Sequence, residues 1–170
     1  ALDRRIQEEF QRARRYALTF SVVLLDVAKL RAYNERFGTV VGDRVMAELG
    51  GILQREIRAP DFVGRYGGDG FALVLPETDI VGARASIGRV RARVEAHDFP
   101  DFAPEDRPTL SAGIVTFPHP AANDTPDLFA LVEAARAAVR YDPYWAAVAA
   151  KLGSRIGEKK TLVAIARRLL

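Results

Sequence analysis

The sequence predicts one α+β domain with a ferredoxin-like or palm-type core, in which helices flank a mostly antiparallel sheet. Hydrophobic periodicity gives the element order β-α-α-β-β-α-β-α after an N-terminal helix. Two short apolar segments flank Gly67-Gly68-Asp69-Gly70, a glycine pattern typical of a hairpin. The apolar fraction is 49% of 170 residues, enough for a sizeable core. We expect the helices to cover one face of this sheet.

The first half of the chain begins with an amphipathic helix over 2–16, with Leu2, Ile6 and Phe10 on one face. The run LTFSVVLLDV at 18–27 predicts a strand buried on both faces, because it is almost wholly apolar. A short helical stretch then ends at Gly38. A longer amphipathic helix is expected from just after Gly42 to about residue 58.

The second half begins with strands at 61–66 and 71–75 around the glycine hairpin. A helix is expected over 79–96, because apolar residues recur there at helical spacing. Three prolines predict a loop over 99–108, and a strand follows at 109–117. The last core helix is expected over 127–140, with Thr125 as its cap.

Residues 1–141 form the predicted domain, and residues 142–170 form a basic tail of uncertain origin, expected to be helical. The tail holds six Lys and Arg against two acids, so the first 141 residues sum to −1 although the whole chain carries +3. The body of the domain therefore gives a nucleic-acid partner no support. The tail reads as two amphipathic helices that pack on the body or lead to a further domain.

Composition excludes several classes of protein. Without cysteine there are no disulfides, no thiol catalysis and no cysteine-bound zinc. His97 and His119 are isolated and are expected on surface loops. No apolar run approaches the roughly 18 residues of a membrane span, so no direct membrane contact is expected. We expect a cytoplasmic domain, with room for a membrane anchor elsewhere in a longer protein.

Two carboxylates stand out by their position. Asp26 closes the buried strand and Asp69 lies in the glycine hairpin. A carboxylate at the end of an apolar strand is costly to desolvate unless it is paired or binds a cation. If the two strands are neighbours, the acids meet at one edge and suit Mg²⁺ with a triphosphate. The alternative is a helix-capping Asp and an ordinary turn Asp.

The residues between these acids resemble the GGDEF family of diguanylate cyclases. The stretch DVAKLRAYNERFGTVVGD at 26–43 has Asn34 eight residues after the first Asp, with Gly-Asp eight and nine residues later. The signature itself is RYGGDGF at 65–71, and residues 73–76 and 109–114 match further. Several spaced motifs in order are more specific than one glycine pair. The resemblance covers roughly residues 1–140.

The resemblance implies a nucleotide cyclase-like fold and a reaction. Two domains, each holding one GTP, face each other as a homodimer and form cyclic di-GMP with release of pyrophosphate. Mg²⁺ or Mn²⁺ would be held by Asp26, Asp69 and the Val27 carbonyl, with Asp69 in the catalytic set. Asn34 and Asp43 would read guanine. Gly67, Gly68, Arg31 and Arg140 complete the implied substrate site.

A second motif, Arg58-Ala-Pro-Asp61, resembles the family's product-inhibition site, with Arg89 as a further arginine. Guanidinium groups bind phosphates and guanine edges through paired hydrogen bonds, and Asp61 could accept from guanine N1 and N2. The alternative is an exposed ion pair at a helix end, which contributes little.

The signature departs from the family at Gly70, where the family has a glutamate of the catalytic set. Ala28, Glu35 and Thr39 also differ, and the last helix lacks a second basic group. The resemblance therefore implies a diguanylate cyclase-type domain with impaired turnover. The alternative is a catalytically inactive module that binds GTP or cyclic di-GMP and controls a linked phosphodiesterase (EAL-type) or other partner domain. An RNA-binding module ranks last, because the strands lack paired aromatic residues.

Overall fold

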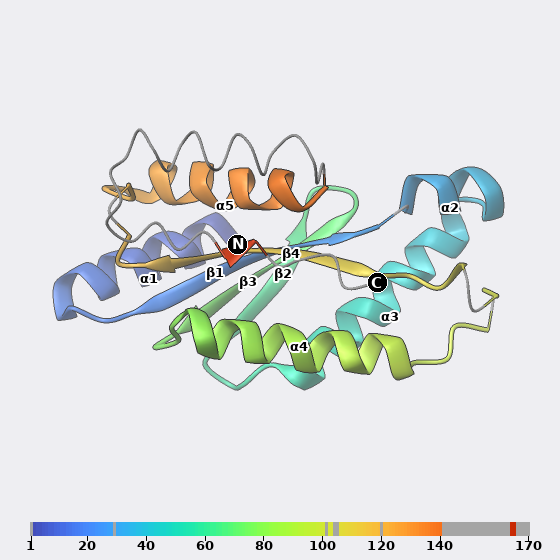
Figure 1. The fold of residues 1–170 in the computed structure, drawn as a ribbon, viewed down its shortest axis with the longest axis horizontal. Helices are drawn as coiled ribbons and strands as arrows, with labels where there is room; N and C mark the ends of the chain where they lie inside the picture. Colours follow the sequence, from blue (N-terminus) through green and yellow to red (C-terminus); the bar gives the residue numbers. More distant parts are fainter. Residues whose placement is uncertain are drawn as a thin grey trace.

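The computed structural model describes residues 2–28, 30–100, 102–103, 106–119, 121–140 and 164–165. Its elements follow the predicted order along the chain (Figure 1). They are α1 (Leu2–Tyr16), β1 (Phe20–Val27), α2 (Leu30–Phe37), α3 (Thr39–Glu56), β2 (Phe62–Tyr66), β3 (Gly70–Pro76), α4 (Ile80–Ala96), β4 (Leu110–Phe117), α5 (Thr125–Arg140) and β5 (Ala164–Ile165).

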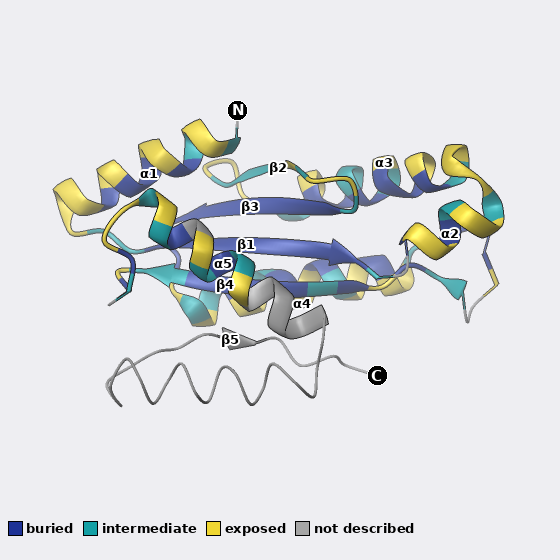
Figure 2. Cartoon of the chain, turned by 90° about the horizontal axis from the view of Figure 1, so that it is seen from above, coloured by how far each residue is buried: buried dark blue, intermediate teal, exposed yellow. Residues whose placement is uncertain are grey.

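The sheet has the strand order β2-β3-β1-β4-β5, and every neighbouring pair is antiparallel. The central strand, β1, is buried along its whole length, and β3 beside it is buried as well (Figure 2). The predicted α+β class with an antiparallel sheet is confirmed. The long apolar run forms the middle strand, where both of its faces and both of its edges are covered.

Helices cover both faces of the sheet, so the expectation of one covered face is wrong. Side chains alternate along β1: Val23 and Leu25 pack in one cluster with α3 and α4, while Val22 and Leu24 pack in the other with α1 and α5. Figure 1 shows α1 and α5 on one side of the sheet and α3 and α4 on the other. A strand that is apolar on both faces requires this second layer.

Two helix boundaries differ from the prediction. Helix α3 begins at Thr39, so Gly42 lies inside it, and Gly38 makes the break from α2 with a φ of 87°. Asp124, not Thr125, caps α5, since its carboxylate accepts from the Asp127 amide at 2.9 Å. No helix among the described residues is both long and apolar enough to cross a membrane.

Only Ala164–Ile165 of the predicted helical tail belongs to the described residues. These two residues form strand β5 at the edge of β4, where a helix was expected. The rest of the tail lies outside the described residues.

Candidate functional site

The first feature of the site is a row of residues across the sheet at the end of β1. Asp26 pairs with Gly70 on β3 and with Ser111 on β4, and Gly70 pairs with Tyr66 on β2. The Val27 amide donates to the Asp69 carbonyl at 2.9 Å. The three residues proposed to bind the metal therefore have adjacent backbones at one end of the sheet.

The Asp26 carboxylate belongs to the sheet face that α1 and α5 cover. Asp26 is 3% exposed and follows Val22 and Leu24 in the alternation of β1. On the same face, the Tyr66 hydroxyl donates to the carboxylate of Glu133 on α5. Glu133 thus brings a further acid toward this row. Sequence reasoning does not identify Glu133 as a site residue, because a lone glutamate on a helix normally faces solvent.

Gly70 is packed too tightly for a side chain in this arrangement. A Cβ built on it would lie 2.6 Å from the Leu25 carbonyl oxygen and 3.1 Å from that of Tyr66. Both obstacles are backbone atoms, which cannot rotate aside. The missing acid of the signature is therefore accompanied by a close approach of β1 and β3.

The donor set suits a divalent ion only in part. The described residues contain no group of three or more His, Cys, Asp or Glu side chains arranged to hold a metal ion. Mg²⁺ often takes only one or two carboxylates and completes its shell with water and substrate phosphates. Asp26, Asp69 and the Val27 carbonyl are compatible with that mode, because they supply two carboxylates and one backbone oxygen.

The turn between β2 and β3 is open to a ligand. Gly67 has a φ of 65°, and both Gly67 and Gly68 are exposed. A Cβ built on Gly68 would meet nothing within 4 Å. The Arg65 guanidinium donates to the Gly68 carbonyl at 2.8 Å and holds the turn. Because neither glycine has a side chain, a phosphate can approach this backbone closely.

Asn34 lies tightly against Gly42 at the junction of α2 and α3. Its Oδ1 atom is 1.8 Å from where a Gly42 Cβ would be, so only glycine leaves room for the amide. This Oδ1 is buried and has no hydrogen-bond partner among the described residues. Asp43, which follows Gly42 in the chain, is exposed. A buried amide oxygen beside an exposed carboxylate is compatible with a ligand that carries several hydrogen-bonding groups.

The two proposed phosphate-site cations are Arg31 on α2 and Arg140 on α5. Arg31 is 92% exposed and donates to Glu35 at 3.0 Å on the outer side of α2. It would have to leave this exposed pair, which costs little, to reach a phosphate. Arg140 is the last residue of α5, and its side chain lies outside the described part of the chain.

The Arg58–Asp61 pair is more buried than the helix-end alternative implies. The Asp61 side chain is 2% exposed, and both of its oxygens accept from Arg58, at 3.0 Å and 3.3 Å. Arg58 also donates to Thr78 Oγ1 at 2.6 Å and to the Pro76 carbonyl at 3.2 Å. Asp61 therefore anchors Arg58. The Asp61 carboxylate can reach a guanine edge only after the Arg58 side chain turns away.

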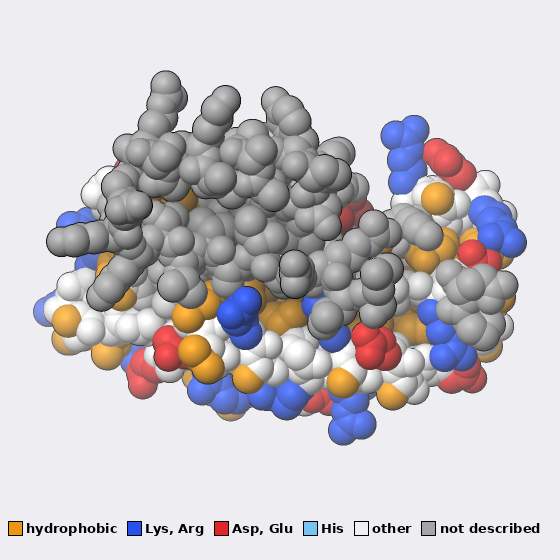
Figure 3. Space-filling model, viewed as in Figure 1, with side chains coloured by type: hydrophobic (Ala, Val, Ile, Leu, Met, Phe, Trp, Pro, Cys, Tyr) orange, Lys and Arg blue, Asp and Glu red, His pale blue; other side chains and the backbone are white. Residues whose placement is uncertain are grey.

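Arg89 lies on α4, whose surface is strongly basic. Figure 3 shows Lys and Arg side chains along the part of the surface where α4 runs. Arg89 is exposed and donates to Ser86 at 3.1 Å. One turn further, Arg93 contacts Glu56 at the end of α3 at 2.9 Å. This face of α4 thus lies toward the end of α3, close in the chain to Arg58.

Both histidines are less exposed than the sequence predicts. His119 is 8% exposed, its Nδ1 accepts from the Ala121 amide at 3.2 Å, and burial lowers its pKa. His97 is half-buried and contacts Glu48 at 2.9 Å. Nearby prolines suggested surface loops, but these loops fold back onto the body. Neither histidine belongs to the site.

Comparisons with known proteins agree with this geometry. A family model described as "Diguanylate cyclase, GGDEF domain" matches residues 1–141. Diguanylate cyclase DgcP of Pseudomonas aeruginosa is 32% identical over 117 residues, which cover 69% of this chain and 17% of that protein. Diguanylate cyclase DosC of Escherichia coli is 31% identical over 130 residues, 76% of this chain and 27% of that protein. The chain thus spans about a quarter or less of these relatives.

Solved structures show the same fold. The active GGEEF domain of a diguanylate cyclase from Vibrio cholerae has a TM-score of 0.72 at 27% identity, covering 81% of this chain and 86% of that one. The GGDEF domain of DgcB from Caulobacter crescentus, in complex with c-di-GMP, has a TM-score of 0.73 at 21% identity, covering 82% and 81%. The chain therefore belongs to the GGDEF-domain family of diguanylate cyclases, the proteins of cyclic di-GMP signalling.

Proposed function

We propose that this domain binds GTP and cyclic di-GMP but forms cyclic di-GMP only slowly. It would then act chiefly as a regulatory module that controls a linked phosphodiesterase (EAL-type) or other partner domain. The main support for the proposal is the packing at Gly70, where the family's glutamate is absent and an added Cβ would lie 2.6 Å and 3.1 Å from two backbone oxygens.

The loss of this acid bears on the metal and therefore on turnover. Position 70 pairs with Asp26 across β1 and β3, so a glutamate there would stand beside that carboxylate on the same sheet face. Divalent ions, Mg²⁺ or Mn²⁺, neutralise charge and orient the in-line displacement in phosphoryl transfer. With two carboxylates in place of three, we expect weaker metal binding and a slower reaction.

Binding of guanine is supported separately by Asn34 and Asp43. Each can hydrogen-bond to a purine edge, and unpaired groups in such a site penalise the wrong base. The Oδ1 of Asn34 is buried without a hydrogen-bond partner in the described part of the chain, and it gains one if the amide turns so that a guanine amino or imino group can donate to it. These residues lie on α2 and α3 and do not depend on position 70.

Binding of cyclic di-GMP is supported by Arg58 and Arg89. Arg58 is half-exposed and held from below by the buried Asp61 carboxylate, so its guanidinium is already ordered. A preorganised guanidinium loses less entropy on binding a phosphate. The domain of DgcB was solved with c-di-GMP, which makes the same ligand a reasonable choice for this chain.

A second candidate function, an efficient cyclase acting as a homodimer, is supported by the retention of Asp26, Asp69 and the open glycine turn. One experiment separates the two candidates. The protein is incubated with GTP and Mg²⁺ at high protein concentration, and cyclic di-GMP is measured by chromatography. Slow or undetectable product supports the regulatory module, and rapid product contradicts it.

Calorimetric titration with cyclic di-GMP tests the sensing function. We expect binding by the unmutated protein and weaker binding by Arg58→Ala. Absence of binding by the unmutated, folded protein would rule out a role as a sensor of cyclic di-GMP. Binding that survives Arg58→Ala and Arg89→Ala together would place the ligand at another site.

A further inference from the structure

The loop between α4 and β4 carries an aromatic cluster that the functions above do not use. Phe102 lies at its centre and is 7% exposed. Its ring centroid is 5.2 Å from that of Tyr33 and 5.2 Å from that of Phe37, both in edge-to-face geometry. Phe99 lies 6.4 Å away on the other side. One loop side chain thus contacts two successive turns of α2.

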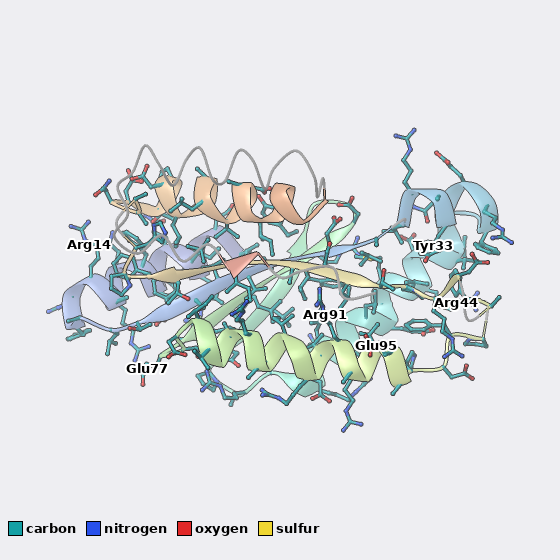
Figure 4. The ribbon with its side chains drawn as sticks, viewed as in Figure 1. Arg14, Tyr33, Arg44, Glu77, Arg91 and Glu95 are labelled. Carbon is teal, nitrogen blue, oxygen red and sulfur yellow. The ribbon has the colours of Figure 1, made fainter. Side chains whose placement is uncertain are left out.

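Helix α2 needs such support because it has only eight residues. Isolated helices shorter than about 12 residues are marginal in water, so tertiary contacts must hold them. The same loop supplies two further contacts. The Tyr33 hydroxyl donates to the Arg107 carbonyl at 3.2 Å, and Arg36 contacts Asp106 at 2.9 Å. Figure 4 shows Tyr33 on the inner side of α2, toward the body of the domain.

Asn34 lies between the two residues that Phe102 contacts. Tyr33 precedes it, Phe37 follows one turn later, and Gly42 of α3 closes on its side chain. We propose that Phe102 is a positioning residue of the guanine site, because it holds α2 where the Asn34 amide faces the base. This inference rests on the proposed binding of guanine at Asn34.

Small displacements matter at such a site. An amide discriminates between bases only while its oxygen and nitrogen point at the right edge, and a shift of about 1 Å is enough to lose a hydrogen bond. Without Phe102, α2 would keep its sequence and its contacts with α3 but lose the ring that fixes Tyr33 and Phe37. We therefore expect guanine selectivity to fall more than stability alone explains.

The test compares Phe102→Ala with the matched control Phe117→Ala. Phe117 also contacts two aromatic rings, those of Phe10 and Phe20 at 4.9 Å and 5.5 Å, but on the opposite face of the sheet. Binding of fluorescently labelled GDP and ADP is measured for each variant. Phe102→Ala should lower the ratio of GDP affinity to ADP affinity about tenfold, which corresponds to the loss of about one hydrogen bond. Phe117→Ala should change it less than about twofold.

Amide hydrogen exchange gives a readout that needs no nucleotide. The Gly38 amide donates to the Asn34 carbonyl at 3.0 Å, so its exchange reports on the end of α2. Exchange at Gly38 and in the last turn of α2 should rise in Phe102→Ala and stay unchanged in Phe117→Ala. If Phe102→Ala does not fold, Phe102→Leu carries the same comparison.

The outcomes separate the two proposals. An unmutated protein without preference for guanine refutes the proposed guanine site, and the assigned selectivity role falls with it, whatever the exchange data show. A protein that prefers guanine but keeps that preference in Phe102→Ala refutes only the role of Phe102. Unchanged exchange in α2 refutes that role as well.

Discussion

Substitution of Gly70 by alanine should destabilise the domain, because β1 and β3 leave no room for a Cβ. The built Cβ lies 2.6 Å from the Leu25 carbonyl oxygen, about 0.8 Å short of ordinary contact. Overpacking of this kind costs about 1–3 kcal/mol, and stretching the nearby bond from Val27 to Asp69 costs about 1 kcal/mol more. Alanine lowers the conformational entropy of the unfolded chain, which offsets about 0.4–1 kcal/mol of this loss of stability. We expect a net loss of about 1–3.6 kcal/mol in the free energy of unfolding.

Urea denaturation followed by circular dichroism measures this loss. Gly68→Ala is the matched control, since it lies in the same turn, its φ is not positive, and its Cβ would meet nothing within 4 Å. It should change stability by less than about 0.5 kcal/mol. A Gly70→Ala protein as stable as Gly68→Ala would show that the strands are not closed at this point. Gly70→Glu faces the same contact, so any gain in cyclase activity should be measured on folded protein.

Gly42→Ala should reduce GTP affinity at least about tenfold, because the added Cβ displaces the Asn34 amide. The free energy of unfolding should stay level or rise, because alanine favours helices. Calorimetry measures the affinity and urea denaturation the stability, and unchanged affinity would contradict the proposed guanine site. Asp61→Ala should lower the free energy of unfolding by about 1–3 kcal/mol, because it removes the carboxylate that holds Arg58. Arg89→Ala, at an exposed position, should leave the urea midpoint unchanged. If the two variants have equal midpoints, Asp61 does not anchor Arg58. Because burial lowers the pKa of His119 below that of the unfolded chain, stability should fall as the pH drops below about 6.5. His119→Gln should lessen the fall in the urea midpoint between pH 7.5 and pH 5. If the variant and the unmutated protein show the same pH dependence, His119 is not the group responsible.

The order of elements could be predicted because it depends on local patterns that the structure preserves. The apolar run that became β1 and the glycine hairpin before β3 were both readable from short stretches. The second helical layer was missed although the same run implied it, since a strand apolar on both faces requires cover on both. Helix α3 begins at Thr39, before the predicted start just after Gly42, because Gly42 lies inside the helix and leaves room for the Asn34 side chain.

The environments of the site residues could not be predicted, because they depend on contacts between distant segments. Arg58 is held partly by Thr78, twenty residues later, so its spacing to Asp61 alone suggested an exposed pair. The packing at Gly70 depends on how closely β1 approaches β3. The contact of Phe102 with α2 joins residues almost seventy positions apart, and the prolines of its loop indicated only irregular structure.

The proposed regulatory function requires that the domain bind nucleotide without turning it over efficiently. Its most direct test is a measurement of product formed per domain with Mg²⁺ and saturating radiolabelled GTP at high protein concentration, run beside a diguanylate cyclase with an intact GGDEF signature. Removal of one group that stabilises the transition state electrostatically typically costs about 10²–10³ in rate, so we predict that bound GTP is converted at least about a hundredfold more slowly than by the intact enzyme. Conversion at a rate equal to that of the intact enzyme would contradict the proposed regulatory function.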